Sequence, residues 1–284
     1  MNSQQIENNR TGDQQLDRLL AIAIAAGKEI LEVYNDPESI EVSIKSDNSP
    51  ITEADRRAHN LIEQSLLNSF PDIPVFSEES ETIDYSVRKN WKSYWLVDPL
   101  DGTKEFVKRN GEFTVNIALV ENGKAVAGVV HVPVTEVSYA GRIGTGAWKM
   151  EAGETNRLKT SVVNTEGTAR IVASRSHRGE LLDNLIGLIN EEFADTEELS
   201  MGSSLKICLV AEGAADIYPR LALTSEWDTA AAHAVLSAAG GMIVDISFNE
   251  LCYNQKEELL NPFFIVLGDC SYDWQLLLAP SLPS

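Results

Sequence analysis

The sequence predicts a mixed α/β (α+β) protein in which helices pack on a largely antiparallel sheet in the first half, while helices and strands alternate in the second. Three observations predict this class: apolar residues at helical spacing in residues 16–34, a hairpin signal at Asn122-Gly123, and the alternation of elements after about residue 160. The chain has 284 residues and 43% of them are hydrophobic, so it can bury a substantial core.

The first part of the chain combines two long helices with several strands. The helix predicted at residues 16–34 ends at Asp36-Pro37. A second helix is expected at about residues 53–70, where Thr52 followed by Asp55 forms a capping-box pattern. Strands are expected at residues 75–77, 94–97, 113–120, 125–132 and 136–140.

The second part alternates strands with helices. Strands are expected at residues 171–173, 216–218, 242–245 and 263–267. Helices are expected at residues 180–192, 203–211 and 229–239, and Gly240-Gly241 ends the last of them. We therefore expect a disordered tail at residues 1–15, an α+β subdomain at 16–160 with most candidate ligands, and an α/β subdomain at 161–284. The active site would lie between the two subdomains of one compact unit.

Composition narrows the classes of function. The formal net charge of −20 argues against a nucleic-acid polymer as partner, because such proteins carry a basic face. The three cysteines are widely spaced and form no CxxC pair, which argues against a disulfide framework or a zinc site. Neither a signal peptide nor a transmembrane segment is recognisable. We expect a soluble, cytoplasmic protein, and peripheral attachment to the cytoplasmic face of the inner membrane stays open.

The segment Asp98-Pro99-Leu100-Asp101-Gly102-Thr103 carries the strongest chemical signal. An apolar strand is expected to end at Asp98, and a second carboxylate follows at Asp101. Two like charges this close repel each other unless a cation lies between them, and oxygen ligands suit Mg²⁺ or Ca²⁺ better than zinc. Gly102-Thr103 would then open a helix whose free N–H groups bind phosphate. The ordinary alternative is an Asp-Pro turn followed by an Asp-Gly turn.

Other acidic residues stand at the ends of predicted elements. Glu78-Glu79 follows a strand, Asp228 comes just before a helix, and Asp55 lies in the first turn of another. Each has an ordinary alternative: a solvated loop for the glutamates, an N-cap for Asp228 and a capping box for Asp55. Together they form a set of carboxylates that can face one cleft.

At these positions the chain resembles the inositol monophosphatase superfamily of lithium-sensitive, Mg²⁺-dependent phosphatases, from about residue 16 to 268. The motifs that carry the resemblance are Asp98-Pro99-Leu100-Asp101-Gly102-Thr103, Trp227-Asp228-Thr229-Ala230-Ala231, Glu78-Glu79-Ser80 and Pro50-Ile51-Thr52-Glu53-Ala54-Asp55. Within the superfamily it is most similar to the bacterial 3′(2′),5′-bisphosphate nucleotidases. That narrower match rests on residues 104–113, 174–177 and 202–206.

The resemblance implies a layered αβαβα sandwich and a role for each matched position. Two or three Mg²⁺ ions would be held by Glu78, Asp98, Asp101, Asp228 and the backbone carbonyl of Leu100. The attacking water would be held and activated by Asp55, Glu78 and Thr103. The substrate would contact Leu100, Asp101, Gly102, Thr103, Ser174, His177, Gly202, Lys206 and Asp228.

The implied reaction is hydrolysis of adenosine 3′,5′-bisphosphate (PAP) to AMP and phosphate, in sulfur assimilation or nucleotide recycling. Conversion of 3′-phosphoadenylyl sulfate to adenylyl sulfate is a second reaction that the resemblance leaves open. The second phosphate of such a substrate needs basic partners, and the candidates beside the motifs are Lys104, Lys108, Arg109, Arg175, Lys206 and Arg220. The alternatives are an inositol-1-phosphate phosphatase and a non-catalytic metal or nucleotide sensor.

Overall fold

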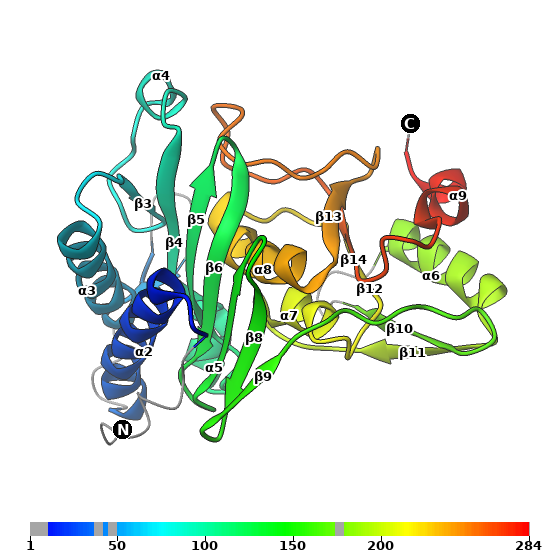
Figure 1. Ribbon diagram of the computed structural model, residues 1–284, viewed down its shortest axis with the longest axis horizontal. Coiled ribbons are helices and arrows are strands. Elements are labelled where there is room, and N and C mark those ends of the chain that lie inside the picture. The colour runs from blue at the N-terminus through cyan, green and yellow to red at the C-terminus, as the bar shows by residue number, and fades with distance from the viewer. Residues whose placement is uncertain (1–10, 37–41, 45–49, 174–178, 284) are drawn as a thin grey trace.

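Two sheets and three sets of helices alternate across the molecule (Figure 1). The computed structural model describes residues 11–36, 42–44, 50–173 and 179–283. In this part of the chain the layers follow the order αβαβα, as the resemblance implied. The mixed α/β class is therefore confirmed.

The outer helical layer and the larger sheet come from the first part of the chain. Helices α2 (Gln14–Asn35) and α3 (Glu53–Ser69) pack side by side, α2 against β5 and β6 and α3 against β4. The sheet has the order β3-β4-β5-β6-β7-β8-β9 and is antiparallel except for the β3–β4 pair. Its strands are β3 (Val75–Ser77), β4 (Ser93–Asp101), β5 (Thr114–Glu121), β6 (Lys124–Val132), β7 (Val137–Arg142), β8 (Gly146–Glu151) and β9 (Glu154–Arg157).

The central helical layer and the smaller sheet come from the second part. Helices α7 (Leu205–Ala211) and α8 (Glu226–Ala239) lie between the sheets, and α6 (Glu180–Glu192) and α9 (Trp274–Leu278) share the outer core beyond the smaller sheet. The smaller sheet has the order β11-β10-β12-β14-β13. Its strands are β10 (Thr168–Val172), β11 (Asp195–Leu199), β12 (Ile217–Arg220), β13 (Met242–Asp245) and β14 (Phe264–Leu267). The short elements elsewhere are β1 (Val42–Ile44), β2 (Pro50–Thr52), α4 (Tyr85–Arg88), α5 (Thr103–Lys108) and the 3₁₀ turn η1 (Ala279–Ser281).

Helix α8 is buried along most of its length because both sheets contact it. Alanines let it approach the larger sheet closely, and the sheet meets it with glycines. A Cβ atom on Gly128 of β6 would lie 2.3 Å from the carbonyl oxygen of Ala231, and one on Gly141 of β7 would lie 2.6 Å from Cα of Val235. The Ala-rich sequence of this helix therefore reflects the narrow space between the sheets.

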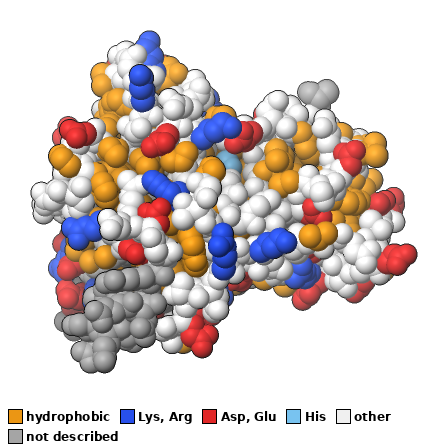
Figure 2. Space-filling view, in the orientation of Figure 1, with side chains coloured by type: hydrophobic (Ala, Val, Ile, Leu, Met, Phe, Trp, Pro, Cys, Tyr) orange, Lys and Arg blue, Asp and Glu red, His pale blue; other side chains and the backbone are white. Residues whose placement is uncertain are grey.

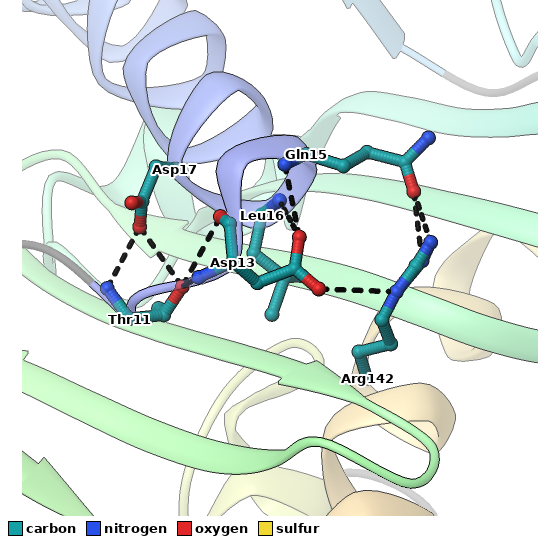
Figure 3. Close-up of polar contacts among 6 residues, drawn as sticks. All are labelled: Thr11, Asp13, Gln15, Leu16, Asp17 and Arg142. Atoms are coloured by element: carbon teal, nitrogen blue, oxygen red, sulfur yellow. Dashed lines mark hydrogen bonds and ion pairs between the residues drawn. The ribbon is translucent and has the colours of Figure 1, made fainter.

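The start of α2 is fixed by a polar cluster (Figure 3). The Asp13 carboxylate accepts hydrogen bonds from the backbone N–H groups of Gln15 (2.9 Å) and Leu16 (3.1 Å), as an N-cap does. Arg142, at the end of β7, lies 3.2 Å from Asp13 through Nε and donates to the Gln15 side chain. Residues 1–10 lie outside the described part of the chain, so the disordered tail stays a prediction for them. Of the other residues assigned to this tail, Gln14 and Gln15 belong to helix α2.

Several boundaries differ from those expected. The strand expected to end near Val97 continues as β4 to Asp101, and the last helix of the central layer begins at Glu226 instead of Thr229. Strands β8, β9 and β11 were not anticipated. β9 and β11 are short and mostly polar, and in β8 the apolar residues Ala147, Trp148 and Met150 do not alternate regularly with polar ones. The two sheets lie on either side of residue 160, and the proposed subdomain boundaries stay a prediction.

On the face drawn in Figure 2, Lys and Arg side chains are scattered among Asp and Glu side chains and form no continuous stripe. None of the helices in the described ranges is long and apolar enough to cross a membrane.

Two buried histidines make the stability of the fold depend on pH. Burial lowers the pKa of both His131 and His233 to about 4, so both are neutral in the fold. Between about pH 4 and 6.5 the unfolded chain therefore binds more protons than the folded one, and stability falls as pH falls through this window. We expect His131→Asn to reduce the slope of the free energy of unfolding against pH by about 1.4 kcal/mol per pH unit, because the unfolded variant binds one proton fewer. Urea unfolding at pH 7.5, 6 and 5 measures the slope, and identical slopes in the two proteins would contradict the prediction.

Candidate active site

A bulge in β4 shapes the central acidic motif. Asp98 pairs with Asn116 and Asp101 pairs with Thr114 of β5, and the register shifts between the two aspartates. The expectation that the strand ends at Asp98 was therefore wrong: the bulge takes up Pro99 and Leu100 while pairing continues. Asp98 is 1% exposed, and its Oδ1 accepts a hydrogen bond of 3.0 Å from the backbone N–H of Leu100.

Gly102 turns the chain from β4 into α5. It takes a left-handed conformation with φ of 95°, and a Cβ at this position would lie 3.3 Å from the carbonyl oxygen of Glu112. Glycine meets both requirements because it lacks a Cβ. The predicted helix opening at Gly102-Thr103 is thereby confirmed, as a helix of six residues.

Two of the candidate aspartates occupy the same position in two different helices. Asp55 of α3 and Asp228 of α8 each lie three residues after the N-cap and complete a capping box. Oδ2 of Asp55 accepts from the backbone N–H (2.7 Å) and hydroxyl (2.6 Å) of Thr52, and Oδ2 of Asp228 accepts from the backbone N–H of Ser225 (2.9 Å). Asp228 is therefore not the N-cap itself, which is Ser225.

Glu78 enters the cluster from the neighbouring strand. β3 runs parallel to β4, with Ser77 paired to Val97, and the backbone N–H of Glu78 donates to the Val97 carbonyl at 3.0 Å. Glu78 therefore leaves its strand directly beside Asp98. Ser77 is fixed from α3, because its hydroxyl lies 3.0 Å from Nδ1 of His59.

These carboxylates act on each other electrostatically. Burial raises the pKa of Asp98 well above its usual range, and the charges of Glu78, Asp101, Asp228 and Asp55 raise it further. Burial likewise raises the pKa of Asp228, and Asp101 and Glu78 add to the shift. Like charges disfavour ionisation unless a cation compensates them.

The donor set fits a hard cation, although the side chains are not yet gathered around one point. Every candidate ligand is an oxygen atom, the chemistry that Mg²⁺ prefers. Within the described part of the chain, however, no group of three or more His, Cys, Asp or Glu side chains is arranged to hold a metal ion. A bound cation would therefore have to draw some of the carboxylates together.

A pocket of about 500 Å³ opens beside the acidic cluster. Of the predicted site residues, it is lined by Asp101, Gly102, Gly202, Lys206 and Asp228. Four basic side chains line the same pocket: Lys104, Lys108, Lys206 and Arg220. The pocket therefore joins carboxylates to basic groups in a chain whose overall charge is strongly negative.

The remaining predicted residues fall into three groups. Leu100 is 1% exposed, and Thr103 is half-buried directly after Gly102. Ser174, Arg175 and His177 lie outside the described residues. The other candidates for catalysis and metal binding belong to the carboxylate cluster: Asp55, Glu78 and Asp98.

Arg109 does not line the pocket, unlike the other basic candidates that the structure describes. Its guanidinium donates to the Tyr34 carbonyl at 2.6 Å and lies over the Tyr34 ring at 5.2 Å from the centroid. Arg109 thus binds Tyr34 of α2, and the structure does not place it where it could contact a second phosphate in this pocket.

Lys206 lines the pocket and also holds the loop at residues 201–203. Burial lowers its pKa to about 8, and its ammonium donates to the backbone carbonyls of Ser203 (2.8 Å) and Met201 (3.3 Å). Gly202 lies inside this loop, where a Cβ would come within 2.9 Å of the Glu112 carbonyl oxygen. The loop is therefore packed against Glu112, which precedes β5 in the chain, and is held by Lys206.

Two polar networks around the site were missed in the sequence. The Ser204 hydroxyl lies within hydrogen-bonding distance of the Asp101 carboxylate and of the Asp228 carbonyl, and Asn116 donates to it. Glu226, 2% exposed, accepts from the backbone N–H of Asn254 at 2.9 and 3.0 Å. Ser204 lies within the motif at residues 202–206, but its partners are far away in the chain and no local pattern could reveal them.

Comparisons with known proteins agree on one family. Residues 13–276 match the family described as the inositol monophosphatase family. The 3'(2'),5'-bisphosphate nucleotidase CysQ of Escherichia coli strain K12 is 46% identical over 251 residues, which cover 88% of this chain and 98% of that protein. The protein of the same name from Haemophilus influenzae is 38% identical, covering 92% of this chain and 95% of that protein. The crystal structure of CysQ from Bacteroides thetaiotaomicron matches with a TM-score of 0.79 and 44% identity, over 89% of this chain and 97% of that one.

The crowded carboxylates predict a gain in stability when one of them is neutralised without metal. Because the folded pKa of Asp98 is raised, its contribution to stability is present at acidic pH and is lost as pH rises. We expect metal-free Asp98→Asn to melt several degrees above the parent protein at pH 8, because each kcal/mol of added stability raises the melting temperature by about 2–4 °C. The difference in melting temperature should become smaller as the pH is lowered toward 4. Calorimetry in EDTA measures both, with Asp72→Asn, at an exposed position, as the control that leaves the melting temperature unchanged. A lower melting temperature for Asp98→Asn at pH 8 would refute the electrostatic account.

Proposed function

The chain belongs to the inositol monophosphatase family, and we propose that within this family it acts as a 3′(2′),5′-bisphosphate nucleotidase. It hydrolyses adenosine 3′,5′-bisphosphate to AMP and phosphate, and so serves nucleotide recycling in sulfur assimilation. The observation that carries the substrate class is the pocket itself, which brings three carboxylates (Asp101, Glu105 and Asp228) and four basic side chains to one cavity.

A substrate with two phosphates matches this division of charge. The phosphate that is removed has to meet the carboxylates, which repel it unless cations are bound. The phosphate that remains needs donors away from them. Lys104 and Lys108 lie one turn apart on α5. Arg220 donates to the Leu223 carbonyl and hydrogen-bonds with the Tyr218 side chain, while its buried Nε has no partner among the described residues. These groups line the pocket where a second phosphate would bind, and a monophosphorylated inositol would bring them no second phosphate.

Proteins of this family are metal-dependent phosphatases, and we propose Mg²⁺ as the metal, with two or three ions per site. Glu78, Asp98, Asp101, Asp228 and the Leu100 carbonyl would hold them. Bound Mg²⁺ would supply the positive charge that offsets the phosphate and would make a water molecule more acidic.

The side chains around this centre would orient the reaction. Thr103 and Asp55, with Glu78, hold the attacking water, and the N–H groups of Gly102 and Thr103 hold the phosphate. Asp55 is suited to this because the backbone N–H and the hydroxyl of Thr52 both donate to one oxygen of its carboxylate and fix its orientation. The water oxygen bonds to phosphorus as the bond from phosphorus to the ribose oxygen breaks, so no phosphoenzyme forms. Ser174, His177, Gly202 and Lys206 are the proposed contacts to the nucleoside and second phosphate.

The substrate assignment predicts a strong preference. We expect the kcat/KM for adenosine 3′,5′-bisphosphate to exceed that for inositol 1-phosphate by more than about a hundredfold, or roughly 2.7 kcal/mol. Steady-state kinetics on both substrates measure the ratio, with 3′-phosphoadenylyl sulfate as a third substrate. Equal efficiency on the two would move the assignment to the inositol phosphatases, and no turnover of any of them would favour a sensor.

A matched pair of variants locates the source of that preference. Arg220→Met should reduce the ratio by about tenfold or more, because it removes a donor to the second phosphate and leaves slow turnover of inositol 1-phosphate nearly unchanged. Arg109→Met serves as the control, since Arg109 is bonded to Tyr34 outside the pocket. Lys206→Ala is less informative alone, because it also removes the bonds that hold the loop at residues 201–203.

Direct attack by water predicts a particular kinetic defect for Thr103→Ala. The hydroxyl would act mainly on the water in the transition state, so the variant should lose kcat, by about a hundredfold, much more than it raises KM. Steady-state assays separate the two constants. Trapping of a phosphoaspartate at Asp98 would instead establish a covalent mechanism.

A further inference from the structure

Ser204 is a buried polar residue with no role yet assigned in the site. It lies 4% exposed directly before α7, where it is the N-cap residue, and Ser203 before it takes a left-handed conformation with φ of 44°. A hydroxyl buried to this extent needs hydrogen-bond partners. Its partners are the proposed metal-binding aspartates from two other parts of the fold.

The first partner is the Asp101 carboxylate. The backbone N–H of Ser204 donates to Oδ2 of Asp101 at 2.6 Å, and its hydroxyl lies 2.7 Å from the same oxygen. Thr114 Oγ1 and Asn116 Nδ2 lie farther from this oxygen, each at 3.4 Å, so the two Ser204 groups are its nearest donors. Hydrogen bonds to a charged acceptor are the strong ones, and they fix the rotation of the carboxylate. Oδ1 of Asp101 has no hydrogen-bond partner in the described residues. Ser204 thus holds one oxygen of the carboxylate and leaves the other for a cation.

The second partner is the backbone at Asp228. The Ser204 hydroxyl lies 2.6 Å from the Asp228 carbonyl oxygen, and it accepts a hydrogen bond of 2.8 Å from Nδ2 of Asn116. A hydroxyl carries a single proton, so it donates to Asp101 or to Asp228 at a given moment. In either state Ser204 lies between the end of β4 and the first turn of α8, and Asn116 fixes it from β5.

We propose that Ser204 is a positioning residue for the metal site, which orients Asp101 and sets its separation from Asp228. The proposal rests on the metal-dependent function proposed above. Residues that hold a metal ligand by hydrogen bonds typically contribute ten- to hundredfold to metal affinity. Ser204 lies two residues before Lys206, a proposed contact to the second phosphate. The same segment therefore positions both a metal ligand and a group that binds the second phosphate.

Mg²⁺ binding without substrate tests the proposal. The protein is freed of metal with EDTA, the chelator is removed, and Mg²⁺ is titrated by isothermal calorimetry. Ser204→Ala keeps the backbone donor but loses the hydroxyl, and we expect its Kd for Mg²⁺ to rise about tenfold or more. The kcat should recover in part as the Mg²⁺ concentration is raised, which a purely structural defect would not show.

Two further variants separate positioning from stability. Ser204→Cys has a similar shape and a weak thiol donor, so it should also weaken Mg²⁺ binding, and it provides the measurement if Ser204→Ala does not fold. Ser161→Ala removes another serine–aspartate bond, 2.5 Å from Ser161 Oγ to Asp216, away from the pocket, and should leave the Kd unchanged. An unchanged Kd in both Ser204 variants would overturn the proposal and leave the phosphatase assignment standing. Absence of Mg²⁺ binding by the unaltered protein would overturn the metal assignment itself.

Discussion

Several carboxylates placed side by side in a buried position form the constraint on which the rest of this structure depends. Their mutual repulsion disfavours the fold when no cation is present, so each aspartate has to be held by its surroundings. All four aspartates of the cluster accept a backbone N–H group. The pairs are Asp55 with Thr52, Asp98 with Leu100, Asp101 with Ser204, and Asp228 with Ser225. Backbone donors cannot rotate away, and they stabilise a charge without cancelling it.

The layered architecture brings these four anchors together. Two are capping boxes at the starts of α3 and α8, helices that lie on opposite faces of the larger sheet, and a third is the bulge of β4 within that sheet. Glu78 joins from β3, which runs parallel to β4 in an otherwise antiparallel sheet. Because α8 is enclosed between two sheets, the first turn that carries Asp228 has little freedom to move. The rigidity of the layers thus sustains an arrangement that electrostatics alone would disperse.

The parts predictable from the sequence are those set by neighbouring residues. The capping box at Thr52 and Asp55, the hairpin at Asn122-Gly123 and the helix at Glu180–Glu192 follow from local patterns, and all three are confirmed. The layer order followed from the resemblance, not from periodicity. Contacts between distant segments had no local signal, and they decide that Ser204 reaches Asp101 and that Arg109 turns to Tyr34. Strands such as β9, which is mostly exposed and polar, are formed by pairing with a neighbour and carry little pattern of their own.

The close approach of Gly202 to Glu112 has a consequence for redesign of the pocket. The backbone at this point lies against Glu112, so a side chain introduced at position 202 to narrow the cavity for a smaller substrate would collide with Glu112. Met201 and Ile207 also line the cavity. A larger or smaller side chain at either position would change the shape of the cavity without displacing Gly202 from Glu112. Met201 and Ile207 are therefore positions at which a substitution can change the volume of the cavity.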